Sequence, residues 1–366
     1  MPAAPFTRLP GIDLETFEHE TLLVRRGTRS GLYTAVAIHS TARGPSLGGC
    51  RMWTYEQPWD GVMDAVRLAR AMTFKSAVAD LPLGGGKGVI MLPAGVAPPT
   101  GEERRAVLLD FGDTVEALGG RYLTAEDVGT STPDMEVINE VTSHVSGLPE
   151  SRGGSGDPSP WTALGVESAI RVACERVFGT DSLEGRTISV IGLGHVGGPL
   201  AELLARAGAR LLVNDIDERR RELADRIGAE WTDAASAFTA DVDVLAPCAL
   251  GGVFDERTVP QLRCRAIAGA ANNQLAHDGI DRLLAERGIL WVPDFVANAG
   301  GVINIAVEFE EGGYGRERAD ARVRGVATTV RTILDHADAN GTTPLAAALE
   351  IAHRRVEEAS GALPTG

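Results

Sequence analysis

Two lysines and one aspartate have neighbours that favour chemistry over simple solvation. Lys87 follows three glycines at residues 84–86, with Lys75 shortly before them, and Asp127 follows a short apolar run. A second cation and partial burial both lower the pKa of an ammonium group, so Lys87 can exchange protons near neutral pH. Together with a nucleotide-binding turn further along the chain, these groups predict redox chemistry on a small carboxylated amine.

That turn has the sequence Gly192-Leu193-Gly194-His195-Val196-Gly197 and follows an apolar run at residues 188–191. A strand, this glycine pattern and a helix together are typical of a dinucleotide site. The glycines permit the tight turn, the approach of backbone to pyrophosphate and the packing of the helix on the strand, respectively. We therefore predict that these residues contact the cofactor: Gly192, Gly194, His195, Val196 and Gly197. A tight turn without a ligand is the alternative.

Asp215 directly follows the next predicted strand, residues 210–214. An acid at this position accepts hydrogen bonds from the adenine ribose hydroxyls and repels a 2′-phosphate, which favours NAD over NADP. Arg219 and Arg220 weaken this preference slightly, although they are more typical of a solvated helix face.

The glycines before Lys87 do not form a phosphate loop, because Gly88 stands where Ser or Thr would bind magnesium. A glycine run also permits close approach of backbone to a ligand, with Lys87 projecting into the site. An ordinary surface lysine is the alternative, and it is the common one for a lysine taken in isolation.

Hydrophobic periodicity predicts the elements that position these residues. Strands are expected at residues 33–39, 89–92 and 122–124. A helix at residues 60–79 places Lys75 near its C-terminal end, where the helix dipole favours a cation. Thr100 and Glu103 match a capping box before another helix.

Residues 151–159 form the clearest loop, and strands then alternate with helices in the pattern of a doubly wound parallel sheet. The expected strands are residues 188–191, 210–214, 242–246, 266–269 and 289–292, and the expected helices are residues 194–207, 316–337 and 344–359. The predicted fold class is therefore α/β with two domains and a cleft between them. Residues 1–145 are expected to form an N-terminal domain that holds the two lysines and on which the helix at 340–366 packs, and residues 146–339 a Rossmann-type NAD-binding domain.

The chain of 366 residues is long enough for two domains, and its 50 acidic and 35 basic residues give a formal charge of −15. That balance argues against a nucleic-acid or acidic-membrane partner. The cysteines Cys50, Cys174, Cys248 and Cys264 lack metal-ligand spacing, so we expect reduced thiols and no metal site. No apolar run approaches the roughly 20 residues that span a bilayer, which favours a cytoplasmic protein.

Several segments resemble the leucine/phenylalanine/valine dehydrogenase branch of the amino acid dehydrogenases, a family that also includes glutamate dehydrogenase. The similarity is collinear from about residue 31 to residue 306, and it is carried by residues 47–53, 72–75, 83–87, 124–129, 159–163, 247–250, 269–274 and 298–302. The resemblance implies reversible oxidative deamination of an L-amino acid with NAD. It also implies a homo-oligomer that assembles through the N-terminal domain.

The resemblance also implies roles for individual residues. Lys75 pairs with the substrate carboxylate, with help from the backbone of Gly48 and Gly49. Lys87 polarises the carbonyl oxygen and activates water, and Asp127 transfers protons to and from the amine. Further positions match residues near the cofactor, and Asn272 also lies near the substrate in the family: Thr162, Cys248, Ala249, Asn272 and Asn298. A turn-forming role is the alternative for the two asparagines.

The substrate side chain is predicted to be apolar. Leu47 replaces the lysine that holds the distal carboxylate in glutamate enzymes, and Ile305 replaces a serine. With Ala125 and Val302, these side chains are expected to line a pocket that rejects glutamate. Ala125 resembles the leucine enzymes, so leucine is predicted, with valine and isoleucine also accepted.

Three alternatives remain open from the sequence. One is a phenylalanine dehydrogenase of the same family, and another is a different NAD enzyme that acts on a hydroxy acid such as malate. The third is a non-catalytic NAD-binding regulator. Gly88 departs from the Thr, Ser or Ala that is commoner after the lysine, and the sequence does not explain it.

Overall fold

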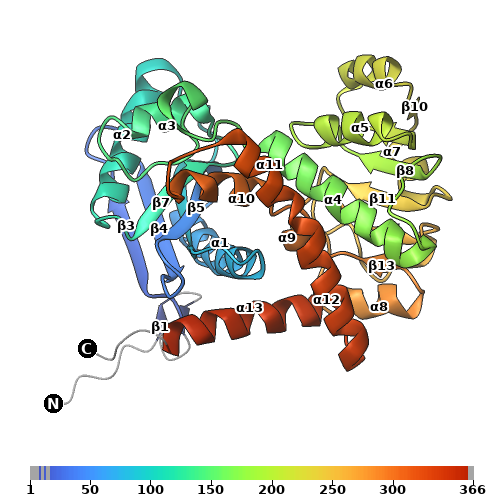
Figure 1. The fold of residues 1–366 in the computed structure, drawn as a ribbon. Coiled ribbons are helices and arrows are strands. Elements are labelled where there is room, and N and C mark those ends of the chain that lie inside the picture. Colours follow the sequence, from blue (N-terminus) through green and yellow to red (C-terminus); the bar gives the residue numbers. More distant parts are fainter. Residues whose placement is uncertain (1–7, 10–11, 14–16, 362–366) are drawn as a thin grey trace. The chain divides into compact units, whose positions relative to one another are not determined.

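A computed structural model describes residues 8–9, 12–13 and 17–361, and Figure 1 shows its ribbon. The chain divides into two compact units, residues 1–156 with 356–366 and residues 157–355. Both units combine helices with a sheet, which confirms the predicted α/β class. The predicted N-terminal domain begins, and the predicted helix 340–366 ends, at residues outside those described.

The first unit contains a five-stranded mixed sheet in the order β3-β4-β6-β5-β7 and a separate two-stranded sheet, β1-β2. Strands β3, β4 and β6 pair antiparallel, whereas β5 pairs parallel to both β6 and β7. The elements of this unit are β1 (Arg8–Leu9), β2 (Ile12–Asp13), β3 (Thr21–Arg26), β4 (Tyr33–Ser40), β5 (Ser46–Tyr55), α1 (Pro58–Val78), β6 (Gly84–Pro93), α2 (Gly101–Glu116), β7 (Tyr122–Glu126) and α3 (Thr132–Ile138).

Alternate residues of β4 enter two different hydrophobic clusters. Val36 and Ile38 pack with residues of α2 and α3, and Ala35 and Ala37 pack with residues of α1. Successive strand side chains point to opposite faces of a sheet, so both faces of this sheet are covered. The continuous apolar run in β4 reflects this double burial.

The glycine run before Lys87 lies inside strand β6, not in a ligand-binding loop. A Cβ atom added to Gly85 would stand 2.0 Å from the backbone nitrogen of Thr73 in α1, and one added to Gly86 would stand 2.7 Å from the Tyr122 ring. The expected approach of backbone to a ligand is therefore wrong for these glycines. Gly85 allows α1 to pack directly against β6, which brings the helix that carries Lys75 onto the strand that carries Lys87.

The second unit contains a six-stranded parallel sheet in the order β10-β9-β8-β11-β12-β13. Numbered from β8, this is the order 3-2-1-4-5-6 of the doubly wound dinucleotide-binding fold. Its elements are α4 (Ser159–Phe178), β8 (Thr187–Ile191), α5 (Gly197–Arg206), β9 (Arg210–Asn214), α6 (Arg221–Ile227), β10 (Glu230–Trp231), α7 (Ala234–Thr239), β11 (Val244–Pro247), β12 (Ala266–Ile267), α8 (Ile280–Glu286), β13 (Leu290–Trp291), α9 (Asp294–Ala297), α10 (Gly300–Ala306), α11 (Arg316–Arg324), α12 (Val326–Asn340) and the larger part of α13 (Pro344–Gly361), whose residues from 356 onward belong to the first unit.

Three local predictions differ from the structure. The helix expected at residues 316–337 is two helices, because α11 ends at Arg324 and Gly325 separates it from α12. Thr100 has the extended backbone of an N-cap, but its side chain makes no capping hydrogen bond. The helix expected from Gly194 begins at Gly197, since the residues between them complete the turn.

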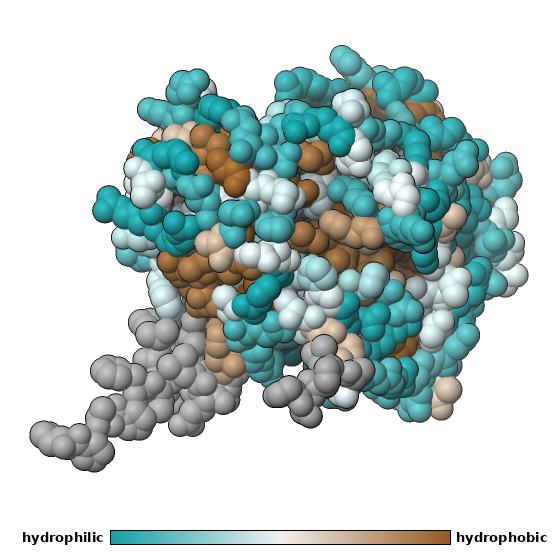
Figure 2. Space-filling view, turned by 60° about the vertical axis from the view of Figure 1, so that its left-hand side comes forward, coloured by the Kyte–Doolittle hydropathy of each residue, from teal (hydrophilic) through white to brown (hydrophobic). Residues whose placement is uncertain are grey.

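The molecular face in Figure 2 is mostly hydrophilic, with hydrophobic areas between the polar residues. The large hydrophobic side chains that are exposed are few among the described residues, and they include Trp53, Ile216 and Leu250. No helix within the described ranges is both long and apolar enough to span a bilayer.

Candidate active site

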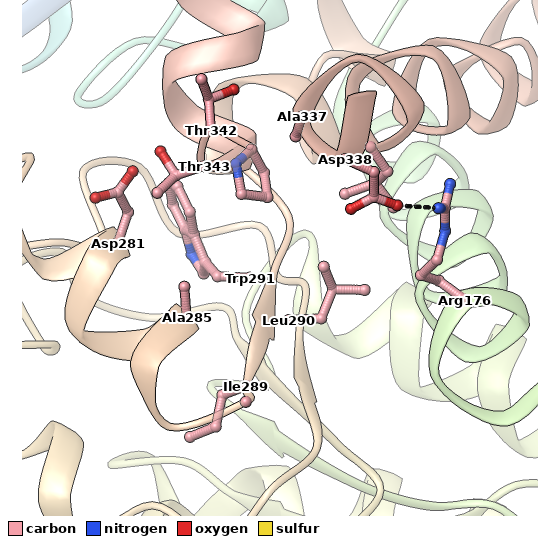
Figure 3. Close-up of a pocket in the computed structure, with 13 residues that line it drawn as sticks. Arg176, Asp281, Ala285, Ile289, Leu290, Trp291, Ala337, Asp338, Thr342 and Thr343 are labelled. Atoms are coloured by element: carbon pink, nitrogen blue, oxygen red, sulfur yellow. Dashed lines mark hydrogen bonds and ion pairs between the residues drawn. The ribbon is translucent and has the colours of Figure 1, made fainter. Parts of the chain in front are cut away.

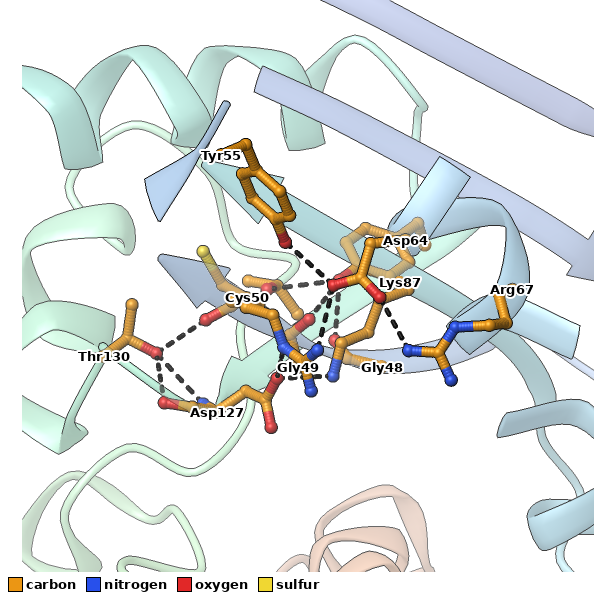
Figure 4. A network of polar contacts seen from close by, with 12 residues as sticks. Gly48, Gly49, Cys50, Tyr55, Asp64, Arg67, Lys87, Asp127 and Thr130 are labelled. Atoms are coloured by element: carbon orange, nitrogen blue, oxygen red, sulfur yellow. Dashed lines mark hydrogen bonds and ion pairs between the residues drawn. The ribbon is translucent and has the colours of Figure 1, made fainter. Parts of the chain in front are cut away.

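Lys87 and Asp127 form an ion pair in the first unit, with 2.6 Å between Lys87 Nζ and Asp127 Oδ2 (Figure 4). Lys87 lies in β6, and Asp127 follows the last residue of β7. Only 5% of Lys87 is exposed. Lys87 is therefore not the surface lysine that its type alone would suggest.

The environment of Asp127 favours its carboxylate form. Burial raises the pKa of this group, but the Lys87 ammonium, the Arg51 guanidinium and a hydrogen bond from the Val128 backbone outweigh burial and lower it. The turn after β7 is fixed by Thr130, whose hydroxyl accepts a hydrogen bond from the Asp127 N–H at 3.0 Å and donates to the Cys50 carbonyl at 2.7 Å. Asp127 is thus a carboxylate in a fixed position.

Gly48 and Gly49 bring strand β5 against this pair. A Cβ atom at Gly49 would lie 2.6 Å from the Cβ of Asp127, so a side chain there would displace the carboxylate. The buried Tyr122 hydroxyl donates a 2.6 Å hydrogen bond to the Gly48 carbonyl. Leu47 in β5 and Ala125 in β7, which are predicted to face the substrate side chain, are both buried.

Lys75 lies in the last turn of α1, as predicted from the helical periodicity. The contact between Thr73 and Gly85 holds this turn against β6. Thr73 precedes Lys75 by two residues in α1, and Gly85 precedes Lys87 by two residues in β6. The structure therefore places the elements that carry the two lysines next to each other.

Gly88 is explained by the core beneath it. A Cβ atom at this position would stand 2.4 Å from Phe111 Cζ and 2.9 Å from the Tyr122 hydroxyl oxygen. Both aromatic side chains are fully buried. The aromatic rings take the space that a side chain at position 88 would need, so any larger residue would have to displace them.

We expect the substitution Gly88→Ala to lower the free energy of unfolding by about 1–3 kcal/mol, the usual effect of overpacking a core. Chemical denaturation of Gly88→Ala, Phe111→Leu and the double variant measures this effect. Phe111→Leu removes the atom nearest to the new methyl group, so the double variant should lose less stability than the sum of the two single variants. Strict additivity would contradict the predicted clash.

Sequence reasoning gave no role to three residues that complete the polar network: Arg51, Asp64 and Tyr55. Arg51 bridges Asp127 and Asp64, at 3.3 Å from Nε and 2.9 Å from Nη1 respectively. The signal was present, because Arg51 follows Gly49 by two residues and strand side chains two apart share a face. Asp64 had no comparable signal, since its place depends on how α1 packs.

In the second unit, the glycine turn and the end of β11 lie together. The Cys248 N–H donates a 2.7 Å hydrogen bond to the Ile191 carbonyl at the end of β8. Added Cβ atoms at Gly192 and Gly197 would meet Ala249 at 2.8 Å and Cys248 at 3.0 Å. The sheet order reverses between β8 and β11, and ligands of open α/β sheets bind at such a switch point. The predicted cofactor residues of both strands thus meet where the fold favours a dinucleotide.

The residues of the turn fit a dinucleotide. Gly192 has φ +95°, and a Cβ atom at Gly194 would meet nothing within 4 Å, which leaves space beside that backbone for a ligand. His195 and Val196 complete the turn before α5. Burial raises the pKa of the Cys248 thiol to about 12, so it stays protonated and unreactive beside the turn.

Asp215 is used partly within the protein. One carboxylate oxygen accepts a 2.6 Å hydrogen bond from the Leu193 N–H, and the other accepts a 2.8 Å bond from the Asp217 N–H. The carboxylate therefore supports the glycine turn in addition to any contact with a ribose. Arg219 is 88% exposed and pairs with Asp217, as expected for a solvated face.

The two predicted asparagines contact each other. Asn298 donates from Nδ2 to Asn272 Oδ1 at 2.8 Å and to the Ala270 carbonyl at 3.1 Å. Asn298 Oδ1 is buried and has no hydrogen-bond partner within the described parts of the chain. A buried acceptor without a partner is unfavourable, so this oxygen is available to a donor from a ligand.

Thr162 and the first residues of α10 pack together in the second unit. Added Cβ atoms at Gly300 and Gly301 would stand 2.1 Å from the Trp161 carbonyl and 2.7 Å from Thr162 Oγ1. Val302 and Ile305, predicted to contact the substrate side chain, follow in α10 and are buried.

A different pocket in the second unit contains none of the predicted site residues. Its volume is about 280 Å³, and an ion pair between Arg176 and Asp338 lies on one side of it, with Trp291 and Asp281 also in its wall (Figure 3). Because Arg176 is already paired with Asp335 and Asp338, the pocket offers no free cation for a carboxylated substrate.

Two family models match the chain. Residues 20–144 match the family model described as "Glu/Leu/Phe/Val dehydrogenase, dimerisation domain", and residues 212–362 match the model described as "Glutamate/Leucine/Phenylalanine/Valine dehydrogenase".

Individual relatives span nearly the whole chain. Leucine dehydrogenase of Thermoactinomyces intermedius is 41% identical over 345 residues, which cover 94% of this chain and 92% of that enzyme. Valine dehydrogenase of Streptomyces albus is 40% identical over 346 residues, with 93% of each chain covered. The crystal structure of L-tryptophan dehydrogenase from Nostoc punctiforme superposes with a TM-score of 0.80 at 34% identity, and covers 95% of this chain and 99% of that one.

Proposed function

The chain belongs to the Glu/Leu/Phe/Val dehydrogenase family, and we propose that it is an NAD-dependent dehydrogenase of branched-chain L-amino acids. The observation that carries this proposal is the buried Lys87–Asp127 pair beside Gly48 and Gly49, in a chain about 40% identical to both leucine and valine dehydrogenases. An amino acid dehydrogenase needs a cation for the substrate oxygen and a base for its amine, and this pair supplies both.

The reaction is the reversible oxidative deamination of an amino acid. One L-amino acid, NAD and water give a 2-oxo acid, ammonium, NADH and a proton. When bound, NAD supplies the acceptor for the hydride of the α-carbon. Gly192, Gly194 and Gly197 would hold its pyrophosphate, Asp215 its adenine ribose, and further contacts would come from His195, Val196, Cys248, Ala249, Thr162, Asn272 and Asn298.

Residues of the first unit would carry out the proton transfers. Lys75 would bind the substrate carboxylate with the backbone of Gly48 and Gly49. Asp127 would accept a proton from the substrate ammonium, so that the amine can form an iminium as the hydride leaves. Lys87, having released its own proton, would accept one from the water that adds to the iminium carbon, and its ammonium would then stabilise the oxygen of the resulting carbinolamine. Asp127 would return its proton to the nitrogen, and ammonia would leave as the hydroxyl group of the carbinolamine gives up its proton to form the 2-oxo acid.

The substrate pocket would be apolar. Leu47 and Ala125 carry no group that could pair with a second carboxylate, and both are buried. A carboxylate that is buried without a partner is strongly disfavoured, so glutamate would be rejected. Val302 and Ile305, buried in α10, are proposed to contact the same substrate side chain.

A panel of L-amino acids with NAD tests the proposed substrate class. We expect kcat/KM for leucine, isoleucine and valine to lie within about 200-fold of one another, because one methylene group changes binding by only about 1–3 kcal/mol. Glutamate should not react. A higher kcat/KM for phenylalanine than for leucine would favour a phenylalanine dehydrogenase, and no oxidation of any amino acid despite NAD binding would favour a regulator.

We expect Asp215→Ala to lower the preference for NAD over NADP, measured as the ratio of the two kcat/KM values, on the order of 10-fold or more. The substitution removes an acceptor for the ribose hydroxyls and a charge that repels the 2′-phosphate. Asp217→Ala is the matched control, because Asp217 lies nearby and pairs with Arg219. Loss of activity with both cofactors at an unchanged ratio would instead leave Asp215 as a support of the glycine turn alone.

We also propose that the protein is a homo-oligomer, because residues 20–144 match a dimerisation domain. Light scattering of the purified chain measures the mass directly, and a monomeric mass of 38.5 kDa would contradict this proposal.

A further inference from the structure

Arg51 contacts the proposed base and a second acid at the same time. Its Nε lies 3.3 Å from Asp127 Oδ2, and its Nη1 lies 2.9 Å from Asp64 Oδ2. Lys87 Nζ approaches the same oxygen of Asp127 at 2.6 Å. Two cations from neighbouring strands, β5 and β6, thus converge on one carboxylate oxygen.

Asp64 holds the other end of Arg51 and is itself held in place. It accepts hydrogen bonds from the Tyr55 hydroxyl at 2.8 Å and from Arg67 Nη2 at 2.7 Å (Figure 4). Burial raises the pKa of Asp64, but these donors and Arg51 outweigh burial and lower it. Asp64 therefore remains an anion that anchors the guanidinium.

The two cations on Asp127 differ in their chemistry. The lysine ammonium can lose its proton during a reaction, whereas a guanidinium stays charged at all relevant pH values. Burial lowers the pKa of Arg51, but Asp127 and Asp64 outweigh burial and raise it, which reinforces this difference. Arg51 is the partner of Asp127 whose charge does not change when Lys87 exchanges a proton.

On the basis of the proposed function, we propose that Arg51 is a positioning residue for the reaction. It fixes the orientation of Asp127 and keeps it a carboxylate while Lys87 is deprotonated, and Asp64 in turn fixes Arg51.

The other titratable groups around Asp127 do not supply this charge. Cys50 on β5 and Tyr122 on β7 are buried, and burial raises the pKa of each, so both stay neutral. The pKa of Tyr55 on β5 is also raised, first by burial and then by its hydrogen bond to Asp64. Lys87 and Arg51 are charged groups that contact Asp127 directly, with Asp64 behind Arg51.

The test compares Arg51→Gln and Arg51→Lys by the pH dependence of kcat/KM for L-leucine with NAD. In Arg51→Gln, Asp127 loses a cation and ionises at higher pH, so the acidic limb of the profile should move to higher pH. The maximum should fall on the order of 100-fold, because the base is no longer oriented. Arg51→Lys restores the positive charge, but not a guanidinium that contacts Asp127 and Asp64 at the same time. The acidic limb should therefore return towards its original position while kcat stays low.

Arg105→Gln is the matched control, because it removes the same charge from an exposed pair with Glu140 in the same unit. It should leave both the maximum and the limb unchanged. Asp64→Asn leaves Arg51 itself in place but weakens its anchor, and should shift the limb in the same direction as Arg51→Gln by a smaller amount. Thermal unfolding and NAD binding of each variant separate these effects from a loss of folding.

The proposal fails if Arg51→Gln keeps the acidic limb of the unmodified enzyme and a kcat/KM within about threefold of it. It also fails if Arg51→Lys restores neither the limb nor the rate while remaining folded, since the role would then be structural. Absence of leucine oxidation in the unmodified enzyme would instead overturn the proposed function, so the two failures are distinguishable.

Discussion

Replacing Lys87 by alanine is expected to lower kcat for L-leucine by about 1,000-fold or more, with no change in NAD affinity. The ammonium group is buried and is aligned by Asp127 at 2.6 Å, so no solvent cation can take its place. Loss of a preorganised charge beside a developing oxyanion usually lowers rates by about 100- to 1,000-fold, and Lys87 would also direct the water. The residues proposed to bind NAD all lie in the second unit. Stopped-flow measurement of NADH formation and NAD titration by fluorescence quantify the two properties.

Lys87→Arg is the informative companion variant. It keeps the positive charge and the partner carboxylate, but a guanidinium does not release a proton and does not fit the same space. We expect it to be nearly as slow as Lys87→Ala. Activity in Lys87→Arg close to that of the unmodified enzyme would show that a fixed charge is sufficient, and it would contradict the proposed proton transfer at this residue.

Replacing Asp127 by asparagine is the second large effect that we expect, with kcat lowered on the order of 100- to 10,000-fold. Asparagine has the same shape but cannot accept a proton from the substrate ammonium. The residual rate should also lose the acidic limb of the pH profile, because the group that titrates there is gone.

Two controls separate chemistry from structure in Asp127→Asn. The substitution leaves Lys87 and Arg51 without their shared counterion, so the free energy of unfolding must be measured beside the rate. Glu126→Gln changes the preceding carboxylate, which accepts a hydrogen bond from Thr132, and it should leave kcat within about threefold. An Asp127→Asn variant that is folded and keeps more than about a tenth of the original kcat would contradict the proposed role of Asp127 as the base.

Periodicity and turn chemistry were sufficient to predict five of the six strands in the parallel sheet of the second unit, all except β10. The short apolar runs at residues 188–191 and 210–214 correspond to β8 and β9. The acid that follows the second run, Asp215, lies close to the glycine turn. These features depend on local sequence, because a short apolar run is enough to indicate a strand of a parallel sheet and the turn needs glycine at fixed places.

Features that depend on packing between distant segments could not be predicted. The glycine run at residues 84–86 predicts contact with a ligand, but its neighbours are Ser40, α1 and Tyr122, which no local pattern reveals. The bridge from Arg51 to Asp64 likewise joins a strand to a helix. Gly325 separates two helices although the apolar spacing continues across it, so periodicity alone merges them.

The amino-acid composition also singles out the two lysines. Lys75 and Lys87 are the only lysines in the chain, and every other member of the 35 basic residues is arginine. A chain that uses arginine everywhere else keeps lysine where a compact ammonium that can lose its proton is needed. An amine-directed reagent followed by peptide mapping would therefore report each of the two side chains separately, with and without substrate.

The most direct test of the proposed reaction is the oxidation of NADH with 4-methyl-2-oxopentanoate, the 2-oxo acid of leucine, in the absence and presence of ammonium. Reductive amination needs ammonia to form the iminium that accepts the hydride. We expect no consumption of NADH until ammonium is added, and then one ammonium consumed for each NADH. Oxidation of NADH at the same rate without ammonium would identify a hydroxy acid dehydrogenase and contradict the account.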